Sequence, residues 1–220
     1  MGSNREMLTV IFDTGSFVYL GETHLCSACP APKYDFTDEN GGSFNMLTGD
    51  YTETYMDGTT LSGSWATGTA CVQDNASTCA ENFTWVALHT ASGLTENADG
   101  IVGMGYAHTA DGHTNILYVP ALFAAGVISE NIFSFLITGD ANTTGNSYID
   151  FGTPDTSVMT SESDIVWIPS TSVGGWWTNN VTGWRYTGSS NEIGLPSTWA
   201  LTDTGTSCLI GPSSVVNTVL

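Results

Sequence analysis

Two aspartates of this 220-residue chain stand in closely similar surroundings. The sequence Val10-Ile11-Phe12-Asp13-Thr14-Gly15-Ser16 is echoed, 190 positions later, by Ala200-Leu201-Thr202-Asp203-Thr204-Gly205-Thr206. A single Asp-Thr-Gly also describes an ordinary turn after a strand, but two copies in matching contexts are more than chance provides. The repeat therefore indicates that Asp13 and Asp203 form a functional pair of carboxylates.

Two carboxylates brought together are suited to acid–base chemistry. They cannot both ionise easily, so they share one proton, and one pKa falls while the other rises. One carboxylate can then deprotonate a water while the other protonates a scissile carbonyl. The pair is therefore predicted to hydrolyse peptide bonds in mildly acidic solution, without a covalent intermediate and without a metal ion.

The residues that follow each aspartate are of types that could hold such a pair in place. Glycine lets the backbone turn sharply and approach a partner closely. The threonines can hydrogen-bond to the opposite loop, and the final hydroxyl groups can orient the outer carboxylate oxygens. The residues expected to support the two loops are Thr14, Gly15, Ser16, Thr204, Gly205 and Thr206.

The elements that must position these loops are predicted to be short strands. Runs rich in β-branched and aromatic residues alternate with turns of Gly, Asn, Asp and Ser. Strands are expected at residues 8–12, 85–88, 132–137, 148–151 and 165–168. Helices are expected only at 118–125 and at 213–220, where Ser213 is a candidate N-cap. The chain is therefore predicted to be mostly β.

Further segments, in the same order along the chain, resemble the pepsin-like aspartic proteases (peptidase family A1). They are residues 2–12, 55–63, 99–105, 132–135, 149–152 and 203–207, the last followed by Gly211-Pro212. The resemblance implies a bilobal acid protease fold. Residues 1–160 would form a complete or nearly complete N-terminal lobe, with the first catalytic loop and the flap. Residues 161–220 would begin a truncated C-terminal lobe with the second loop.

The same resemblance implies a function for particular residues. Asp13 and Asp203 would be the catalytic dyad of an aspartic endopeptidase. Tyr55, with Gly58 and Thr59, would form a flap that closes over the substrate, excludes water and holds the peptide as a strand. Residues 99–105 would thread beside the first loop. No cofactor is implied, and the expected partner is a peptide or protein substrate bound by a monomer.

Two departures from the family pattern leave a second function open. Leu20 stands where the family usually has a tryptophan that bonds the flap tyrosine, so this bond would be lost or supplied by Tyr19. The chain starts near the first catalytic strand and stops 17 residues after Asp203, so we expect truncation at both ends, little activity and exposed strand edges. The alternative is a catalytically impaired, peptide-binding relative.

A third function, a carbohydrate-binding β module, is suggested by the aromatic residues near the second motif. Trp176-Trp177, Trp184 and Tyr186 could stack on sugars, although aromatic residues in mixed strands more often belong to a core. Sugar recognition would also leave both Asp-Thr-Gly motifs without a role. We therefore rank this function below the other two.

The five cysteines suggest an oxidising compartment. Cys26 with Cys29, and Cys71 with Cys79, are close enough in sequence to form small disulfide loops, which leaves Cys208 unpaired. A zinc site that includes His24 is an alternative, but seven residues separate the second pair, more than in a zinc knuckle. A thioredoxin-like redox pair would need a βαβ context that the sequence lacks.

The charge excludes several classes of partner. Three Lys and Arg residues stand against 22 Asp and Glu, a net charge of −19, and the three cations are scattered singly. Nucleic acid and anionic membranes both require clustered cations, so neither is expected as a partner. Carboxylates neutralise near pH 4, so the composition suits the secretory pathway, the extracellular space or an acidic compartment of lysosomal or vacuolar type.

Four glycosylation sequons occur along the chain. They begin at Asn75, Asn82, Asn142 and Asn180. A chain this rich in Asn, Ser and Thr would contain about three by chance. The sequons by themselves therefore do not establish secretion.

Overall fold

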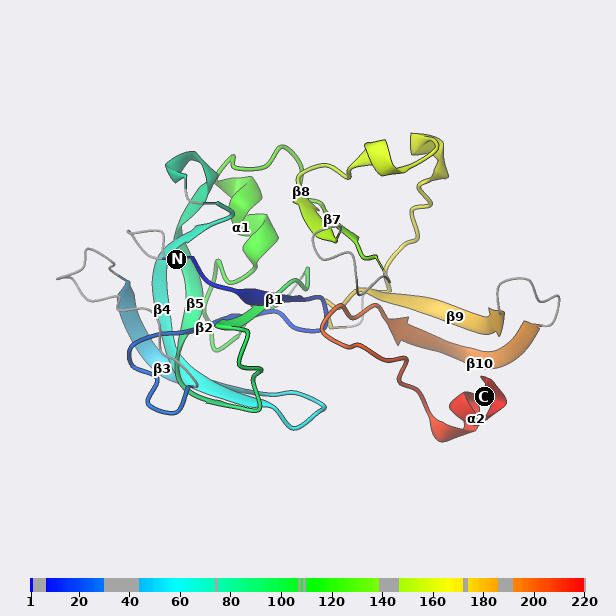
Figure 1. Cartoon of the computed structure of the whole chain (residues 1–220), viewed down its shortest axis with the longest axis horizontal. Coiled ribbons are helices and arrows are strands. Elements are labelled where there is room, and N and C mark those ends of the chain that lie inside the picture. The colour runs from blue at the N-terminus through cyan, green and yellow to red at the C-terminus, as the bar shows by residue number, and fades with distance from the viewer. Residues whose placement is uncertain are drawn as a thin grey trace.

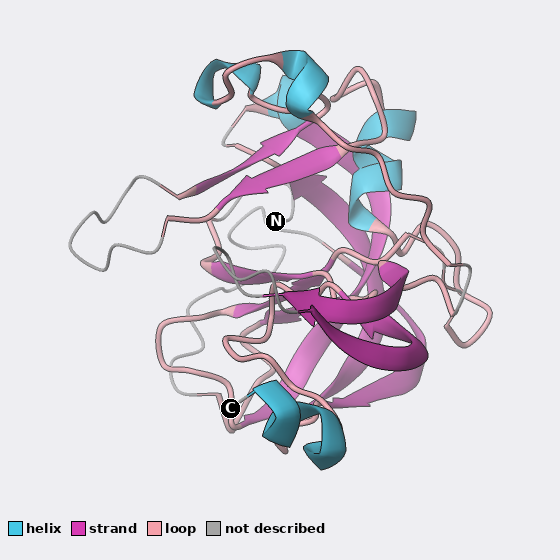
Figure 2. Ribbon diagram, turned by 90° about the vertical axis from the view of Figure 1, so that its right-hand side faces the viewer, coloured by secondary structure: helices cyan, strands magenta, loops and turns pink. Residues whose placement is uncertain are grey.

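The computed structural model describes residues 1, 7–29, 44–73, 75–106, 108, 110–138, 147–171, 174–185 and 192–219. Within these residues the chain is mostly β, as predicted, and the few helices lie at the periphery of the strands (Figures 1 and 2). The first half of the chain builds one large sheet, and the second half contributes two separate two-stranded ribbons.

The large sheet has six strands. They are β1 (Val10–Asp13), β2 (Tyr19–Glu22), β3 (Asn45–Thr54), β4 (Thr60–Cys71), β5 (Cys79–Ser92) and β6 (Gly100–Gly103), in the spatial order β1-β6-β2-β5-β4-β3. Strand β6 pairs in parallel with β1 and antiparallel with β2. Strands β3, β4 and β5 form an antiparallel meander. Because β6 lies between β1 and β2, it holds both ends of the loop that joins them.

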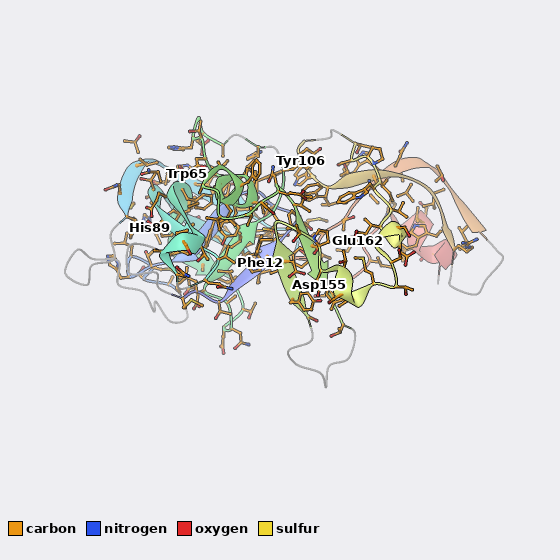
Figure 3. All side chains as sticks on the ribbon, turned by 90° about the horizontal axis from the view of Figure 1, so that it is seen from above. Phe12, Trp65, His89, Tyr106, Asp155 and Glu162 are labelled. Carbon is orange, nitrogen blue, oxygen red and sulfur yellow. A yellow bond between two sulfur atoms is a disulfide. The ribbon has the colours of Figure 1, made fainter. Side chains whose placement is uncertain are left out.

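The remaining elements are short. Strands β7 (Phe133–Leu136) and β8 (Tyr148–Phe151) form one ribbon, and β9 (Thr178–Arg185) and β10 (Glu192–Leu201) form the other. The helices are α1 (Tyr118–Ala124) and α2 (Ser213–Val219), with 3-10 turns η2 (Ala76–Thr78), η3 (Thr156–Val158) and η4 (Glu162–Asp164). Figure 3 shows Asp155 and Glu162 on the other side of Phe12 from Trp65 and His89.

The core of the large sheet divides into two clusters, because successive residues of a strand point to opposite faces. On β5, Trp85 belongs to one cluster and Val86 to the other. On β2, Tyr19 and Leu20 separate in the same way. Leu20 is fully buried, which stabilises the fold by about 2 kcal/mol. The alternation decides which side chains of β2 can reach the flap.

Most of the elements expected from sequence are present. The strand at 148–151 has the predicted limits, those at 8–12, 85–88 and 132–137 overlap β1, β5 and β7, and the two helices are α1 and α2. The strand predicted at 165–168 is wrong. No described strand pairs with this segment, and Val166, Trp167 and Ile168 are 77%, 70% and 67% exposed. A short apolar run forms a strand only where a partner strand satisfies its backbone groups.

Both predicted disulfides are present. Cys26 is bonded to Cys29, and Cys71 to Cys79, and the latter pair joins the end of β4 to the start of β5. Cys208 is free and exposed. The expected strand residues 2–6, the sequon residue Asn142 and the aromatic residue Tyr186 lie outside the described residues.

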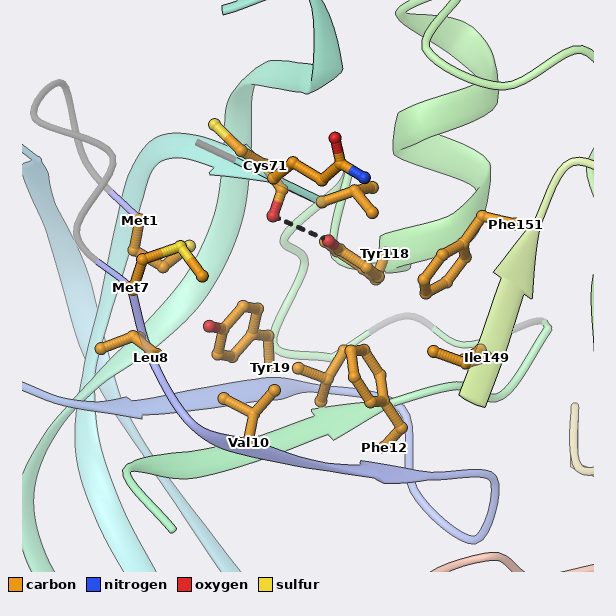
Figure 4. A pocket seen from close by; sticks show the side chains of 13 residues that line it. Met1, Met7, Leu8, Val10, Phe12, Tyr19, Cys71, Tyr118, Ile149 and Phe151 are labelled. Carbon is orange, nitrogen blue, oxygen red and sulfur yellow. Dashed lines mark hydrogen bonds between the residues drawn. The ribbon is translucent and has the colours of Figure 1, made fainter. Parts of the chain in front are cut away.

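A cavity of about 330 Å³ lies beside the large sheet, between the start of the chain, α1 and β8 (Figure 4). Leu8, Phe12, Tyr19 and Phe151 line it, and the Tyr118 hydroxyl at its edge donates to the Cys71 carbonyl over 3.1 Å. No acidic, basic or histidine side chain is among its described lining residues, so this cavity is not where acid–base chemistry would occur.

Candidate active site

The first Asp-Thr-Gly loop is fixed between strands by backbone hydrogen bonds. Asp13 ends β1 and lies opposite Gly103 of β6 in the parallel register. The Met104 amide donates to the Asp13 carbonyl over 2.8 Å, and the Gly105 amide donates to the Ser16 carbonyl over 2.9 Å. The segment after β6 therefore runs beside the loop and supports its backbone on both sides of the aspartate.

The second loop follows β10. The Thr202 amide donates to the Trp177 carbonyl over 3.0 Å, which ties the end of β10 to the start of β9. Figure 1 shows the ends of β1 and β10 directed toward one another. The two Asp-Thr-Gly loops therefore meet where these strands end.

Hydrogen bonds between the two threonines join the loops reciprocally. The Thr14 amide donates to Thr204 Oγ1 over 3.1 Å, and the Thr204 amide donates to Thr14 Oγ1 over 2.9 Å. Each hydroxyl then donates to a carbonyl of the opposite chain segment, Thr14 to Thr202 over 2.7 Å and Thr204 to Phe12 over 2.6 Å. Four bonds thus fix the separation of the loops.

Glycine is required in both loops because each lies against the opposite carboxyl group. A Cβ atom at Gly15 would lie 2.7 Å from Asp203 Cγ, and one at Gly205 would lie 2.5 Å from Asp13 Oδ1. A Cβ atom at either position would therefore push the opposite carboxyl group away. The glycines allow the two carboxyl groups to come close enough for Asp203 to raise the pKa of Asp13.

The two carboxyl groups have different surroundings. Asp13 is 5% exposed, and burial raises its pKa to about 6, with a further rise from the hydrogen bond and charge of Asp203. The Ser16 hydroxyl and the Gly15 amide act in the opposite direction and lower this pKa. Asp203 is half-buried, and it accepts hydrogen bonds from the Gly205 amide over 2.8 Å and from Thr206 Oγ1 over 2.6 Å. The pair can hold one proton between unequal partners.

Ser16 and Thr206 occupy equivalent positions but differ in their contacts. Thr206 bonds the outer oxygen of Asp203, whereas Asp13 receives its closest bond from the Gly15 amide, 2.8 Å from Oδ1. The Ser16 Oγ atom is buried beside Asp13 without a well-aligned partner among the described residues. The serine hydroxyl is therefore the less constrained of the two.

A hairpin turn between β3 and β4 covers the first loop. The Tyr55 amide donates to the Thr59 carbonyl over 2.8 Å, and Gly58 takes a φ of +91°, which favours glycine. The Tyr55 hydroxyl is buried near Ser16 and Asp13, and burial together with the Asp13 charge raises the Tyr55 pKa. The Tyr55 side chain therefore lies close to the first aspartate.

The tip of this hairpin has an internal brace that the sequence did not reveal. The Asp57 carboxylate accepts from the Thr59 amide over 2.8 Å and from Thr59 Oγ1 over 3.0 Å. Thr59 is 8% exposed, whereas Met56 is 91% exposed at the tip. The hydrogen bonds from Thr59 lower the Asp57 pKa.

Leu20 provides no hydrogen bond to the flap, and Tyr19 does not replace it. Leu20 and Trp65 belong to the same buried cluster, and Tyr55 packs against that cluster. Tyr19 points to the other face of the sheet, where its ring packs 6.2 Å from Phe83. Among the described residues, the Tyr55 hydroxyl has no well-aligned hydrogen-bond partner. The sequence left open whether the hydrogen bond to Tyr55 is lost or is supplied by Tyr19, and in the structure it is lost.

Two tryptophans contribute to the site in a way that sequence reasoning missed. Trp176 Nε1 donates to the Gly15 carbonyl over 3.2 Å, and Trp177 Nε1 donates to the Met104 carbonyl over 2.8 Å. These contacts join positions 161 and 73 residues apart, so no local pattern could have indicated them. Figure 3 labels Tyr106, whose ring packs 4.8 Å from that of Trp177. Both indoles are thus engaged inside the molecule.

An aromatic row continues from Trp176 along the first loop. Phe17 packs 5.4 Å from Trp176 and stacks on His108 at 4.4 Å. His113 packs 4.6 Å from Trp65. His108 and His113 are the one histidine pair whose spacing could suit a ligand, and from their Gly/Asp-rich loop we expect both to be solvated. His108 is exposed and His113 is half-buried, and each packs on a buried ring. No group of three or more potential metal ligands occurs in the described part of the chain.

Comparison with known proteins identifies the family. A family model described as Eukaryotic aspartyl protease matches residues 1–220. Similar proteins include Rhizopuspepsin-3 of Rhizopus niveus, Pepsin-3 of Oryctolagus cuniculus and Renin of Echis ocellatus, with 26%, 25% and 28% identity. All of this chain aligns with 54%, 55% and 55% of these proteins, so it spans about half the length of the curated relatives it matches. The chain belongs to the eukaryotic aspartyl protease family.

Proposed function

We propose that this protein is an aspartic endopeptidase that hydrolyses peptide bonds in acidic solution. The observation that carries the proposal is the junction of the two Asp-Thr-Gly loops, where reciprocal threonine bonds bring the Asp13 and Asp203 carboxyl groups into contact. The hydrogen bonds between the threonines and the close approach at the glycines both act to hold the two carboxyl groups side by side. A purely structural turn would not require two ionisable groups to face each other.

In this proposal the unequal surroundings of the carboxyl groups assign the acid and the base. Below a pH of about 6, Asp13 holds the proton of the pair. Asp203 then takes a proton from a bound water, whose oxygen forms a bond to the scissile carbon while Asp13 protonates the carbonyl oxygen. The resulting tetrahedral diol collapses when Asp203 gives the proton taken from water to the amide nitrogen and the carbon–nitrogen bond breaks. One diol hydroxyl passes its proton back to Asp13 as the carboxylic acid product forms, so both carboxyls return to their starting protonation.

The hairpin turn would act as the flap. Tyr55 lies over Asp13, and the backbone near Gly58 and Thr59 could pair with an extended peptide. Closure over the substrate would exclude water other than the reacting molecule. Because the Tyr55 hydroxyl lacks an aligned partner, it remains free to bond the substrate backbone or the reacting water.

The setting of the enzyme is part of the same proposal. Residues 1–160 would form one lobe and 161–220 the start of the second, with the dyad at their junction. Two disulfides and a net charge of −19 support a secreted protein or one in an acidic vacuolar or lysosomal compartment. No helix in the described residues is long and apolar enough to span a membrane. A monomer acting on peptide or protein substrates, without nucleic acid, cofactor or metal, is the expected form.

The test compares two asparagine variants of the protein with a matched control. At about pH 4, Asp13→Asn and Asp203→Asn should each slow cleavage of an unfolded protein substrate by at least about a thousand-fold, because either change removes the acid or the base. Asp164→Asn, an exposed carboxylate on η4, should leave the rate unchanged. Cleavage at the wild-type rate by Asp13→Asn would contradict the proposal.

A second candidate function is peptide binding without efficient catalysis. It is favoured by Leu20, because the flap tyrosine then lacks the hydrogen bond that would fix it over the dyad. In the same assay, this candidate predicts that the wild-type protein binds an extended peptide but does not cleave it. Equal peptide affinity in wild type and Asp13→Asn, with no turnover in either, would favour binding.

A further inference from the structure

The turn between β4 and β5 contains a modification signal that the proposed function does not use. The Cys71–Cys79 disulfide closes this turn, and the sequon Asn75-Ala76-Ser77 lies inside it. All three sequon residues are exposed. Sequence alone could not separate this sequon from the other three, but the structure distinguishes it from those at Asn82 and Asn180.

The side chains of Asn75 and Ser77 are already in contact. Asn75 Oδ1 accepts one hydrogen bond from the Ser77 amide and another from Ser77 Oγ, both over 3.0 Å. Among the described residues no acceptor binds the Asn75 Nδ2 atom, and the residue itself is exposed. A sugar transferase must reach this nitrogen and recognise the hydroxyl two residues later. Here both groups stand together on one exposed turn.

The sequon at Asn82 is presented differently. Asn82 lies within β5 with a φ of +53°, and Thr84, which carries the required hydroxyl, is 4% exposed. The Thr84 amide donates to the Asn115 carbonyl over 3.0 Å, so this segment is held in the sheet. A transferase could reach the Thr84 hydroxyl only if β5 were displaced.

The sequon at Asn180 is also held in a strand. Asn180 and Thr182 lie on one face of β9, where residues two apart are separated by about 7 Å. The hydroxyl therefore cannot contact the amide as it does at Ser77. Asn142 lies outside the described residues.

The geometry at Asn75 depends on few other parts of the chain. The hydrogen bonds join residues two positions apart, and the enclosing disulfide spans eight. Loops this short close quickly, whereas burial of Thr84 requires strands distant in sequence. The turn can therefore form before the rest of the fold, when a nascent chain meets modifying enzymes.

We propose that Asn75 is an N-glycosylation site of this protein. The amide nitrogen of Asn75 forms a bond to the anomeric carbon of an oligosaccharide carried on a lipid diphosphate. The bond between that carbon and the diphosphate oxygen breaks, the lipid diphosphate leaves with the electron pair, and the amide proton passes to a base of the transferase. A glycan here would not obstruct the dyad, because β4 starts at the flap turn and ends at Cys71, so its length separates the two features.

The test is site mapping on the protein secreted from a eukaryotic host. An amidase that releases N-glycans converts the modified asparagine to aspartate, and mass spectrometry of the peptide spanning Cys71 to Cys79 reports the change. We expect Asn75 to be occupied in wild type, unoccupied in Ser77→Ala and occupied again in Ser77→Thr. Asn82→Gln and Asn180→Gln should retain the Asn75 glycan.

Two results would overturn the proposal. One is an unmodified Asn75 in secreted protein whose two disulfides have formed, whether or not another sequon is occupied. The other is a glycan that persists on Asn75 in Ser77→Ala. Neither result bears on the dyad, because the asparagine variants of Asp13 and Asp203 test that function separately.

Discussion

At the residue scale, the site depends on two aspartates of the same sequence context that differ in environment. Asp13 is buried and its pKa is raised to about 6, while Asp203 is half-buried and accepts hydrogen bonds from Gly205 and Thr206. Two identical motifs therefore provide two unequal groups. In the proposed reaction, this inequality would let one carboxyl act as an acid while the other acts as a base.

The raised pKa of Asp13 predicts a pH-dependent contribution to stability. Because the folded state binds this proton more tightly than the unfolded state, the contribution is full below pH 3.8 and is lost as the pH rises through about 6. The difference corresponds to about 3 kcal/mol. Asp13→Asn cannot ionise, so its free energy of unfolding should exceed that of wild type at pH 7 and approach it near pH 4.

Urea unfolding of wild type and Asp13→Asn at several pH values measures this contribution. Asp164→Asn is the control, since that carboxylate is exposed and should show no comparable change. A free-energy difference between wild type and Asp13→Asn that does not vary between pH 4 and pH 7 would show that Asp13 is not held in its protonated form by the fold.

At the element scale, the β3–β4 hairpin, which is the proposed flap, combines a long ribbon with a braced tip. Strands β3 and β4 supply the ribbon, and the Asp57 carboxylate braces the turn by accepting two hydrogen bonds from Thr59. Thr59 Oγ1 can also donate to the Gly93 carbonyl, which lies 3.3 Å away, just after the end of β5. The Asp57 carboxylate therefore orders the tip, whereas the pairing of β3 with β4 orders the rest of the hairpin.

Substitution of Asp57 should loosen the turn without unfolding the sheet. Asp57→Ala removes both acceptors, so the Thr59 amide should exchange with solvent several-fold faster. Asp57→Asn keeps one acceptor, so its Thr59 exchange rate should lie between those of Asp57→Ala and wild type. Hydrogen exchange followed by mass spectrometry measures the rate. If Asp57→Ala left the Thr59 exchange rate unchanged, the brace would have no effect.

The same brace has a defined pH dependence. The hydrogen bonds from Thr59 lower the Asp57 pKa in the folded state. The stability that this carboxylate contributes is therefore present above pH 3.8 and is lost only as the pH falls through the lowered pKa of the folded protein. The flap tip should therefore remain braced at a pH of about 4, where the dyad is expected to work.

At the scale of the whole molecule, the β9–β10 ribbon is joined to the large sheet at the first loop. Trp176 and Trp177 donate to the Gly15 and Met104 carbonyls, and the threonine bonds add a second junction. The two halves of the site therefore depend on contacts between segments that are far apart in sequence.

Trp177→Phe should weaken this junction. The variant keeps an aromatic ring but leaves the Met104 carbonyl without its 2.8 Å partner, at a cost of about 1–3 kcal/mol in the free energy of unfolding. The matched control is Trp199→Phe, because Trp199 is 51% exposed on β10 and should change stability by about 0.5 kcal/mol or less. Equal destabilisation by the two variants in urea unfolding would contradict the assigned role of Trp177.

The candidate dyad could be recognised from sequence because its evidence is local and repeated. Asp13 and Asp203 each sit in a short motif, and the chemistry of threonine and glycine indicates how such motifs meet. The contacts of Trp176 could not be predicted, since they depend on how distant segments fold together. The strand expected at 165–168 was wrong for a related reason: its pattern was suitable, but no described strand pairs with it.

The most direct test of the shared proton is a carbon-13 NMR titration of the Asp13 carboxyl, assigned by its loss in Asp13→Asn. The signal should titrate near pH 6 in wild type. In Asp203→Asn it should titrate at a lower pH, but still above 3.8, because burial remains when the neighbouring charge is gone. An Asp13 carboxyl that titrates near 3.8, with no response to Asp203→Asn, would contradict a proton-sharing dyad.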